Sequence, residues 1–256
     1  MRIRILGCGD SGGVPRVGND WGACDPSNPR NNRTRTSVAV EHLGETWLID
    51  TSPDLRAQML RTGLETVDGI LFTHAHADHI LGLDETRVVH FTSKKMIPIY
   101  GDAPTLGALR QFFGYLFQND LSPKPPALYP QFLVSHEVAG PFPWLDQTVV
   151  PFHQDHGYSH SLGYRFKDWA YSTDVVHLDE AAFEALHGIR LWLVDCIDYQ
   201  PKPSHSHLEQ TLRWIERVQP KRAVLIHMSR LLDYDTLSRQ LPPGVEAAYD
   251  GMVIDL

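Results

Sequence analysis

Short apolar runs alternate with polar turns along the whole chain. In the first half they predict strands at residues 2–6, 37–40, 47–50, 70–72 and 97–100, and helices at 54–62 and 105–113. In the second half they predict strands at 148–152, 162–166, 170–172, 191–195 and 223–226, and helices at 179–186 and 208–218. Strands and helices therefore alternate in both halves, which indicates an α/β fold.

Length and composition favour one large domain over residues 1–256, because 42% apolar and 21% charged residues are ordinary for a globular chain. No apolar stretch is long enough to cross a bilayer, so we expect no membrane partner. Residues 1–6 already read as a strand and leave no room for a signal peptide, which favours the cytoplasm. Cys8, Cys24 and Cys196 are too scattered for a disulfide framework, and we expect reduced thiols.

The net charge of -8 argues against an extended nucleic acid as the partner and favours a small molecule. A small basic patch stands out against it, formed by Arg30, Arg33 and Arg35. We expect Arg33 and Arg35 to meet a phosphate group of the substrate, with a solvated loop as the open alternative. The proline-rich stretch 119–130 is expected to shape the mouth of a site, and the sequence allows a homodimer.

The densest chemical signal follows the apolar run at 69–72, in the sequence Thr-His-Ala-His-Ala-Asp-His at 73–79. It places His74, His76, Asp78 and His79 within six residues. Imidazole nitrogens and a carboxylate oxygen suit zinc, manganese or iron. A set of merely solvated polar side chains is the alternative, and so tight a spacing makes it the weaker interpretation.

The His-x-His-x-Asp-His motif after a strand resembles the signature of the metallo-β-lactamase superfamily. The resemblance implies an αββα sandwich that holds two divalent ions, zinc or manganese with iron also open, and hydrolysis by a hydroxide between them. It implies His74, His76 and His156 as ligands of one ion, and Asp78, His79 and His227 as ligands of the other. Asp174 would bridge the two ions, Asp78 would also be catalytic, and His153 competes with His156 as the third ligand.

The opening at 6–15 contains Gly-x-Gly-x-x-Gly, but Val14-Pro15 follows at once and no helix continues, so a dinucleotide fold is rejected. The opening instead resembles the PhnP-like branch, whose phosphodiesterase opens a ribose cyclic phosphate. His205 aligns with a catalytic histidine of that branch, although a helix cap at Ser204 or His205 stays open. His160 is a candidate substrate contact, and Asp50 is expected to orient the metal loop.

The branch also has a cysteine-rich zinc segment after its Trp-Gly pair, where this chain has only Cys24 after Trp21-Gly22. We therefore expect the same chemistry on a different ester. The leading hypothesis is a metal-dependent phosphodiesterase for a small cyclic phosphate or a nucleotide-like ester. Hydrolysis of a thioester, lactone or lactam, or nucleotide binding without turnover, are the alternatives, and RNA processing ranks lower because no basic arm is evident.

Overall fold

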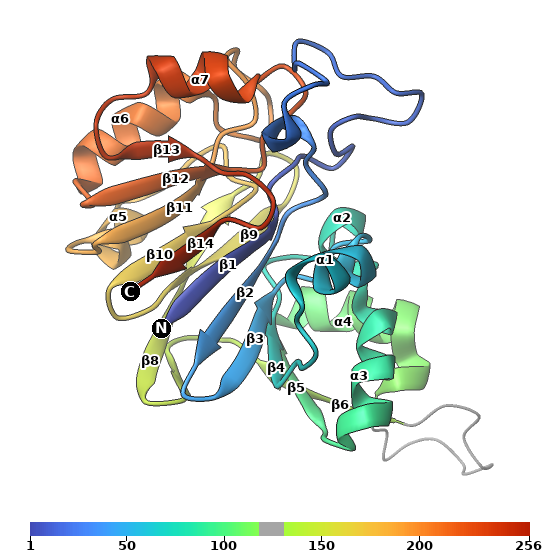
Figure 1. Ribbon diagram of the computed structural model, residues 1–256. Coiled ribbons are helices and arrows are strands. Elements are labelled where there is room, and N and C mark those ends of the chain that lie inside the picture. The colour runs from blue at the N-terminus through green and yellow to red at the C-terminus, as the bar shows by residue number, and fades with distance from the viewer. Residues whose placement is uncertain (118–130) are drawn as a thin grey trace. The chain divides into compact units, whose positions relative to one another are not determined.

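The computed structural model describes residues 1–117 and 131–256, so the segment 119–130 lies outside the described residues. Two compact units make up the chain, each with its own seven-stranded sheet (Figure 1). Unit 1 contains residues 1–6, 37–139 and 253–256, and unit 2 contains residues 7–36 and 140–252. The boundary of a single domain over 1–256 stays a prediction.

The sheet of unit 1 has the strand order β14-β1-β2-β3-β4-β5-β6. The strands are β1 (Arg2–Gly7), β2 (Ser37–His42), β3 (Glu45–Ile49), β4 (Gly69–Leu71), β5 (Ile97–Gly101), β6 (Leu133–Glu137) and β14 (Val253–Asp255). Strands β3 to β6 are parallel, so their carboxyl ends meet at one edge of the sheet. That edge is where β4 delivers the histidine-rich segment.

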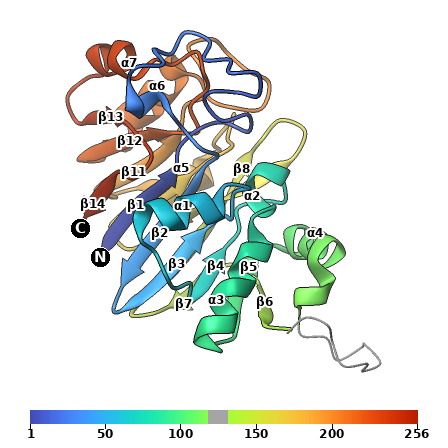
Figure 2. The same cartoon turned by 45° about the vertical axis from the view of Figure 1, so that its right-hand side comes forward.

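Helices α1 (Leu55–Thr62), α3 (Thr86–Ser93) and α4 (Ala103–Phe113) lie along this sheet in both views (Figures 1 and 2). Their buried apolar residues, among them Leu55, Val89 and Leu109, form one core cluster with Ile70 of β4 and Ile99 of β5. Burial of each such side chain stabilises the unit by roughly 1.5–3 kcal/mol. The core therefore holds β4 rigidly beneath the segment that follows it.

The sheet of unit 2 has the strand order β13-β12-β11-β10-β9-β8-β7. The strands are β7 (Phe142–Trp144), β8 (Gln147–Asp155), β9 (His160–Arg165), β10 (Trp169–Ser172), β11 (Leu191–Asp195), β12 (Arg222–Ile226) and β13 (Val245–Ala247). Strands β10 to β13 are parallel, and β8 and β10 are each antiparallel to β9. The carboxyl ends of β8, β10, β11 and β12 therefore share one edge of this sheet.

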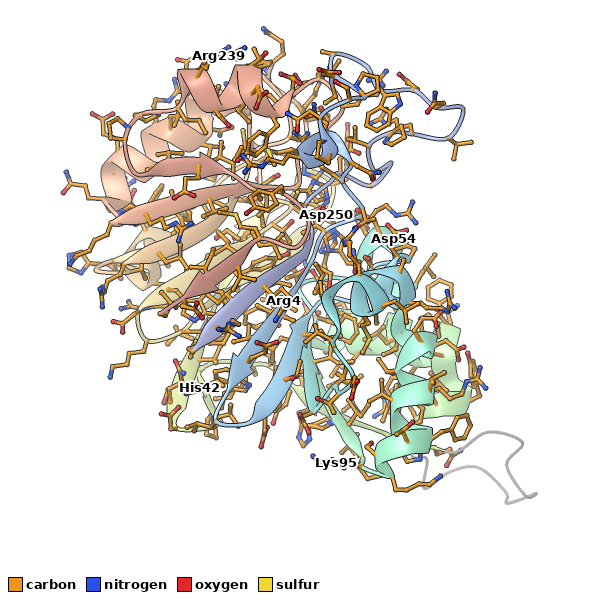
Figure 3. The ribbon with its side chains drawn as sticks, in the orientation of Figure 1. Arg4, His42, Asp54, Lys95, Arg239 and Asp250 are labelled. Atoms are coloured by element: carbon orange, nitrogen blue, oxygen red, sulfur yellow. The ribbon has the colours of Figure 1, made fainter. Side chains whose placement is uncertain are left out.

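Unit 2 also contains α5 (Glu180–Leu186), α6 (Leu208–Val218) and α7 (Tyr234–Gln240). Helices α5 and α7 are each preceded by an N-cap aspartate, Asp179 and Asp233, whose carboxylate accepts a hydrogen bond from the backbone N–H three residues further along the chain. The segment 7–36 is largely irregular, with a short 3-10 turn at Pro29–Asn31. It is attached at its base by Asp250, whose carboxylate accepts hydrogen bonds from the backbone N–H groups of Cys8 and Thr34 (Figure 3).

The predicted elements recur in the structure with ends shifted by a few residues, and the α/β fold is confirmed as two sheets with helices. The apolar patterns did not predict α3, α7 or the strands β6, β7, β13 and β14. Among the described residues, no helix is long and apolar enough to cross a membrane.

Candidate metal centre

The first group of candidate ligands lies at the carboxyl end of β4, in the segment 73–79, here called the histidine loop. The ring of His74 lies 4.5 Å from that of His76 and 4.4 Å from that of His79, measured between centroids. The Oδ2 atom of Asp78 lies 3.3 Å from Nε2 of His79. His74 and His79 are buried and His76 is exposed, so unit 1 brings all four predicted ligands of this loop together.

A fully buried carboxylate, Asp50 at the end of β3, holds the histidine loop in place. Its Oδ2 lies 2.7 Å from Nδ1 of His79 and accepts a hydrogen bond of 2.7 Å from the hydroxyl of Thr73. Its Oδ1 accepts a bond from the Thr73 backbone N–H. Burial raises the pKa of the Asp50 carboxyl, and the contact with His79 opposes that rise. Asp50 therefore has the orienting contacts that the sequence predicted for it.

Part of the histidine loop is helical. Asp78 and His79 lie in the one-turn helix α2 (Ala77–Ile80), where the sequence predicted a loop. The turn is fixed because the Thr51 backbone N–H donates a 2.7 Å hydrogen bond to the His79 carbonyl. This single turn of helix directs the side chains of Asp78 and His79 toward His74. In a fully extended segment, successive side chains would point to opposite sides.

The second group, here called the aspartate cluster, lies where β8, β10, β11 and β12 end in unit 2. It consists of His156, Asp174, Asp195, His205 and His227. Three of these residues end or follow neighbouring parallel strands, namely Asp174 after β10, Asp195 at the end of β11 and His227 after β12. Carboxyl ends of parallel strands are a common position for binding sites in α/β folds.

Asp174 is nearly fully buried and lies between two imidazoles. Its Oδ2 lies 3.4 Å from Nε2 of His156, and its Oδ1 lies 3.3 Å from Nε2 of His227. Each carboxylate oxygen thus faces a different histidine, an arrangement that suits a carboxylate shared by two cations. His156 is buried at this position whereas His153 is exposed, so the geometry favours His156 over the competing register.

His205 lies against both histidines of the cluster. Its ring is stacked on that of His227 at 4.9 Å and meets that of His156 edge-on at 4.8 Å. Its Nδ1 lies 3.2 Å from Oδ2 of the fully buried Asp195, and its Nε2 lies 3.9 Å from Oδ2 of Asp174. Helix α6 begins at Leu208 with His207 at the N-cap, so neither Ser204 nor His205 is the cap that remained open.

The residue that sequence reasoning missed is Asp195. Its Oδ2 also accepts a hydrogen bond from the Val175 backbone N–H, and its Oδ1 lies 3.9 Å from Nδ1 of His227. The signal was present, because Asp195 ends an apolar run in the same way as the candidates that follow β10 and β12. Ligand atoms of Asp195, His205 and His227 lie within 4.8 Å of one another.

The hydrogen bonds determine which ring nitrogens carry a proton. Nδ1 of His156 lies 2.6 Å from the Ser204 carbonyl, and Nδ1 of His79 faces the Asp50 carboxylate; both oxygens only accept, so both Nδ1 atoms donate. The Thr73 hydroxyl donates to Asp50 and so accepts from Nδ1 of His74 at 3.0 Å. Each ring then has its lone pair on Nε2, the tautomer of a metal-binding histidine.

This donor set fits divalent cations. It offers imidazole Nε2 atoms and carboxylate oxygens, which suit zinc, manganese and iron. Oxygen acceptors behind ligand histidines are the usual support of such rings. The residues therefore fit the metal ions that the motif predicted, while the donor types leave the identity of the metal open.

Three residues of these groups have an unusual backbone. Asp50, Asp174 and His227 have φ values of 60°, 53° and 57°, in the left-handed region that non-glycine residues seldom adopt. Each directly ends a strand or follows it within two residues. Such conformations cost of order 1 kcal/mol and concentrate at functional sites. The backbone here turns each side chain toward its group.

The predicted substrate contacts have different surroundings. The guanidinium of Arg33 is buried and donates to the carbonyls of Ser229 at 3.2 Å and Leu232 at 2.7 Å. It therefore ties the segment 7–36 to the chain after β12, and its role as a substrate contact has no support in this geometry. Arg35 is half-buried, and His160 is exposed at the start of β9, with its ring 5.9 Å from that of His153.

Residues 45–228 match the model of the beta-lactamase superfamily domain. A solved structure described as a new diphosphatase from the PhnP family has a TM-score of 0.90 and 33% identity, with 100% of this chain and 97% of that chain covered. The chain therefore belongs to the metallo-β-lactamase superfamily and, within it, to the PhnP-like branch. The fold and this neighbour support a hydrolase.

The chain is also similar to two curated proteins with different names. An octanoyltransferase of Porphyromonas gingivalis is 33% identical over 255 residues, which cover 98% of this chain and 51% of that protein. The coenzyme PQQ synthesis protein B of Xanthomonas campestris pv. campestris is 30% identical over 172 residues, covering 59% of this chain and 51% of that protein. The chain spans about half the length of these curated relatives.

Proposed function

We propose that the chain is a phosphohydrolase with two divalent metal ions, which cleaves small phosphodiesters, cyclic phosphates or diphosphate esters. The ligands in this proposal are His74, His76 and His156 for one ion, Asp78, His79 and His227 for the other, and Asp174 for both. The observation that carries the proposal is the Asp174 carboxylate, whose two oxygens face two different Nε2 atoms. The similarity to a PhnP-family diphosphatase supports a phosphate ester as the substrate.

Two divalent ions bound by these residues supply Lewis acidity and lower the pKa of water to near neutrality. The protein's own contribution is geometric. Asp50 fixes His79 directly and His74 through Thr73, while the Ser204 carbonyl fixes His156. Ligands held in this way need no rearrangement when substrate binds, and that preorganisation is what makes a site effective.

His205 is the proposed general acid. Its Nδ1 donates to the buried Asp195 carboxylate, and its Nε2 faces Asp174 and is the atom proposed to meet the substrate. A proton held on Nε2 would pass to the departing alkoxide as the phosphorus–oxygen bond breaks. Proton transfer by a positioned side chain contributes typically 10²- to 10⁴-fold. Asp78, half-buried beside His79, is proposed to orient the attacking water while it binds its ion.

Gly157 makes the His156 contact possible. Its φ is +76°, and a Cβ atom there would lie 2.5 Å from the Pro203 carbonyl oxygen. The chain at 203–205 can therefore pass directly over Gly157, which brings the Ser204 carbonyl to His156 and carries His205 into the cluster. The glycine after His156 thus supports both the proposed ligand and the proposed acid.

The test is hydrolysis of bis-p-nitrophenyl phosphate and a ribose cyclic phosphate by protein supplied with zinc or manganese. We expect turnover that a chelator abolishes and that His205→Ala slows by roughly 10²- to 10⁴-fold. His187→Ala is a matched control, because His187 caps the far end of α5. An enzyme with its metal that leaves all phosphate esters intact would contradict the proposal.

Hydrolysis of a thioester is the second candidate, favoured by the similarity to a protein named for octanoyl transfer. The same metal ions can polarise a carbonyl group. Release of thiol from an octanoyl thioester, at a higher kcat/KM than that for phosphodiesters, would favour this candidate. Because the chain spans about half of that relative, we rank it below phosphate ester hydrolysis.

A further inference from the structure

The segment 10–16, here called the glycine turn, lies beside the strand end that carries His227. The Asp10 backbone N–H donates to the Met228 carbonyl at 3.2 Å, and the Met228 N–H donates to the Cys8 carbonyl at 2.8 Å. Gly9 is bridged to Met228 as a neighbouring strand would be. The start of the turn is therefore about 5 Å, one strand spacing, from the chain that carries a proposed ligand.

Within this turn, the side chain of Arg16 is held by the carboxylate of Asp10. The Asp10 side chain is buried, with its Oδ2 2.6 Å from Nη2 of Arg16 and its Oδ1 accepting a 3.1 Å bond from the Gly12 N–H. A Cβ atom at Gly12 would lie 2.6 Å from Nε of Arg16, so the absence of a side chain at Gly12 leaves room for Arg16 to lie against the turn. Asp10 thus fixes the direction of Arg16.

The glycine turn is itself fixed in place. The Arg16 N–H donates to the Asp20 carbonyl at 2.9 Å, and the Asp20 carboxylate accepts a 2.7 Å bond from Nε of Arg230. Arg230 follows β12, and its backbone carbonyl also accepts a hydrogen bond from the Ala23 N–H. The position of Arg16 is therefore set by contacts on both sides of it, in advance of any ligand.

A comparison of Arg16 with Arg33, in the same segment, separates a structural arginine from an available one. Arg33 is 1% exposed and directs its donors at backbone carbonyls. The Arg16 side chain is 41% exposed, and a guanidinium has five N–H donors, of which the contact with Asp10 uses a fraction. Arg35 is a second cation next to the glycine turn, since its Cδ lies 3.6 Å from the position that a Cβ atom at Gly13 would take.

We propose that Arg16, together with Arg35 and the glycine turn, binds a second phosphate of the substrate, next to the phosphoryl group that is attacked. The inference rests on the proposed function and makes Arg16 a specificity-determining residue. A planar guanidinium held by a buried carboxylate matches two oxygens of one phosphate. The Asp10 carboxylate neutralises the charge of Arg16, and Arg35 adds a further positive charge that attracts a phosphate. The preferred substrates are then esters of a nucleoside diphosphate type.

The kinetic test compares ADP-ribose, which has two linked phosphates, with bis-p-nitrophenyl phosphate, which has one. Arg16→Ala is expected to lower kcat/KM for ADP-ribose by roughly 10- to 100-fold, mainly through KM, as expected for the loss of a hydrogen bond to a charged group. The rate on bis-p-nitrophenyl phosphate should change less than about twofold. For ADP-ribose, kcat/KM of Arg16→Lys should lie between the values of wild type and Arg16→Ala, since lysine keeps the positive charge without the paired N–H donors of a guanidinium. Arg213→Ala, on the exposed side of α6, is the matched control.

A binding test keeps the inference separate from turnover. Calorimetric titration of wild type and Arg16→Ala with AMP and with α,β-methylene-ADP measures what the second phosphate adds. We expect tighter binding of the diphosphate by wild type, and loss of that difference in Arg16→Ala. If neither substrate is cleaved but this difference is found, the proposed function is wrong and the inference stands. An equal loss on both substrates, or no dependence on Arg16 in either experiment, overturns the inference.

Discussion

The histidine loop of unit 1 and the aspartate cluster of unit 2 present the same kind of donors through opposite constructions. In the loop, four candidate ligands lie within six residues, and one buried carboxylate, Asp50, stands behind them. In the cluster, the candidates come from the ends of β8, β10 and β12 and from the segment before α6, with Asp195 behind them.

The difference shows what each region depends on. The histidine loop needs correct local backbone, since a one-turn helix and the contacts of Thr73 and Asp50 suffice to orient its rings. The aspartate cluster needs the whole parallel sheet in register, because Ser172 pairs with Val194 and Asp195 with Ile226. A local motif is therefore sensitive to its supporting hydrogen bonds, and a dispersed one to the fold.

The largest effect is expected from Asp174→Ala, because only Asp174 is proposed to contact both ions. We expect hydrolysis to fall well beyond the roughly 10- to 100-fold that loss of a supporting residue costs. Far-ultraviolet circular dichroism checks that the variant is folded. A folded variant within tenfold of wild-type activity would remove Asp174 from the metal centre.

The next comparison is between the two supporting carboxylates, tested with Asp50→Asn and Asp195→Asn. Each should cost roughly 10- to 100-fold in metal affinity or activity. Asp50→Asn should act on metal affinity, because Asp50 orients His79 and, through Thr73, His74. Asp195→Asn should act mainly on kcat, because its shortest contact with a cluster histidine is to the proposed acid His205.

Titration of each variant with zinc, followed by kcat at saturating metal, separates the two effects. If Asp195→Asn lowers metal affinity as strongly as Asp50→Asn does, then His205 or its neighbour His227 depends on Asp195 as a ligand. The separate role proposed for His205 would then be wrong.

The role of Arg33 is tested by Arg33→Met. The substitution leaves the Ser229 and Leu232 carbonyls without their buried donor, at a cost of roughly 1–3 kcal/mol each. We expect a lower free energy of unfolding in denaturant titration and an unchanged KM below the unfolding transition. A raised KM without loss of stability would restore Arg33 as a substrate contact.

The smallest expected effect concerns Asp233, at the N-cap of α7. Although burial opposes it, hydrogen bonds from the Thr236 N–H, Asn31 and the Asp25 N–H lower the pKa of Asp233 from 3.8 to about 2. Because this pKa is depressed in the folded state, its stabilising effect is full above pH 4 and is lost as the pH falls toward 2. Asp233→Ala should cost about 1 kcal/mol at pH 7.

Thermal unfolding of wild type and Asp233→Ala between pH 7 and pH 2 measures how the stabilisation by Asp233 depends on pH. The two curves should converge as the pH falls, since protonation removes in wild type what the substitution removes in the variant. A constant difference across that range would show that Asp233 acts through packing and not through its charge.

The sequence predicted the two regions unequally, for physical reasons. His74 to His79 form a contiguous motif, so their proximity needs no tertiary information. His156, Asp174 and His227 are far apart in the chain and were assigned through the resemblance to the superfamily, and Asp195 was overlooked although it ends a strand in a similar way. Nothing in the residue types foretold the left-handed backbone at Asp174 or His227, which the surrounding sheet imposes.

The arginines of the segment 7–36 also show what the sequence could not predict. Arg16, Arg33 and Arg35 look alike in sequence, and burial is what distinguishes them, since Arg33 is enclosed by the chain after β12 and Arg16 is not. Burial depends on contacts between residues almost two hundred positions apart, such as Arg33 with Ser229, a separation of 196. No periodicity within the segment carries that information.

The most direct test of the central claim is the metal content of wild type, His74→Ala and His156→Ala after loading with manganese or zinc, measured by inductively coupled plasma mass spectrometry. We predict two ions per chain in wild type. Each variant should lose one ion, although the two histidines come from different groups. Two ions retained in either folded variant, or one ion in wild type, would contradict the proposed centre.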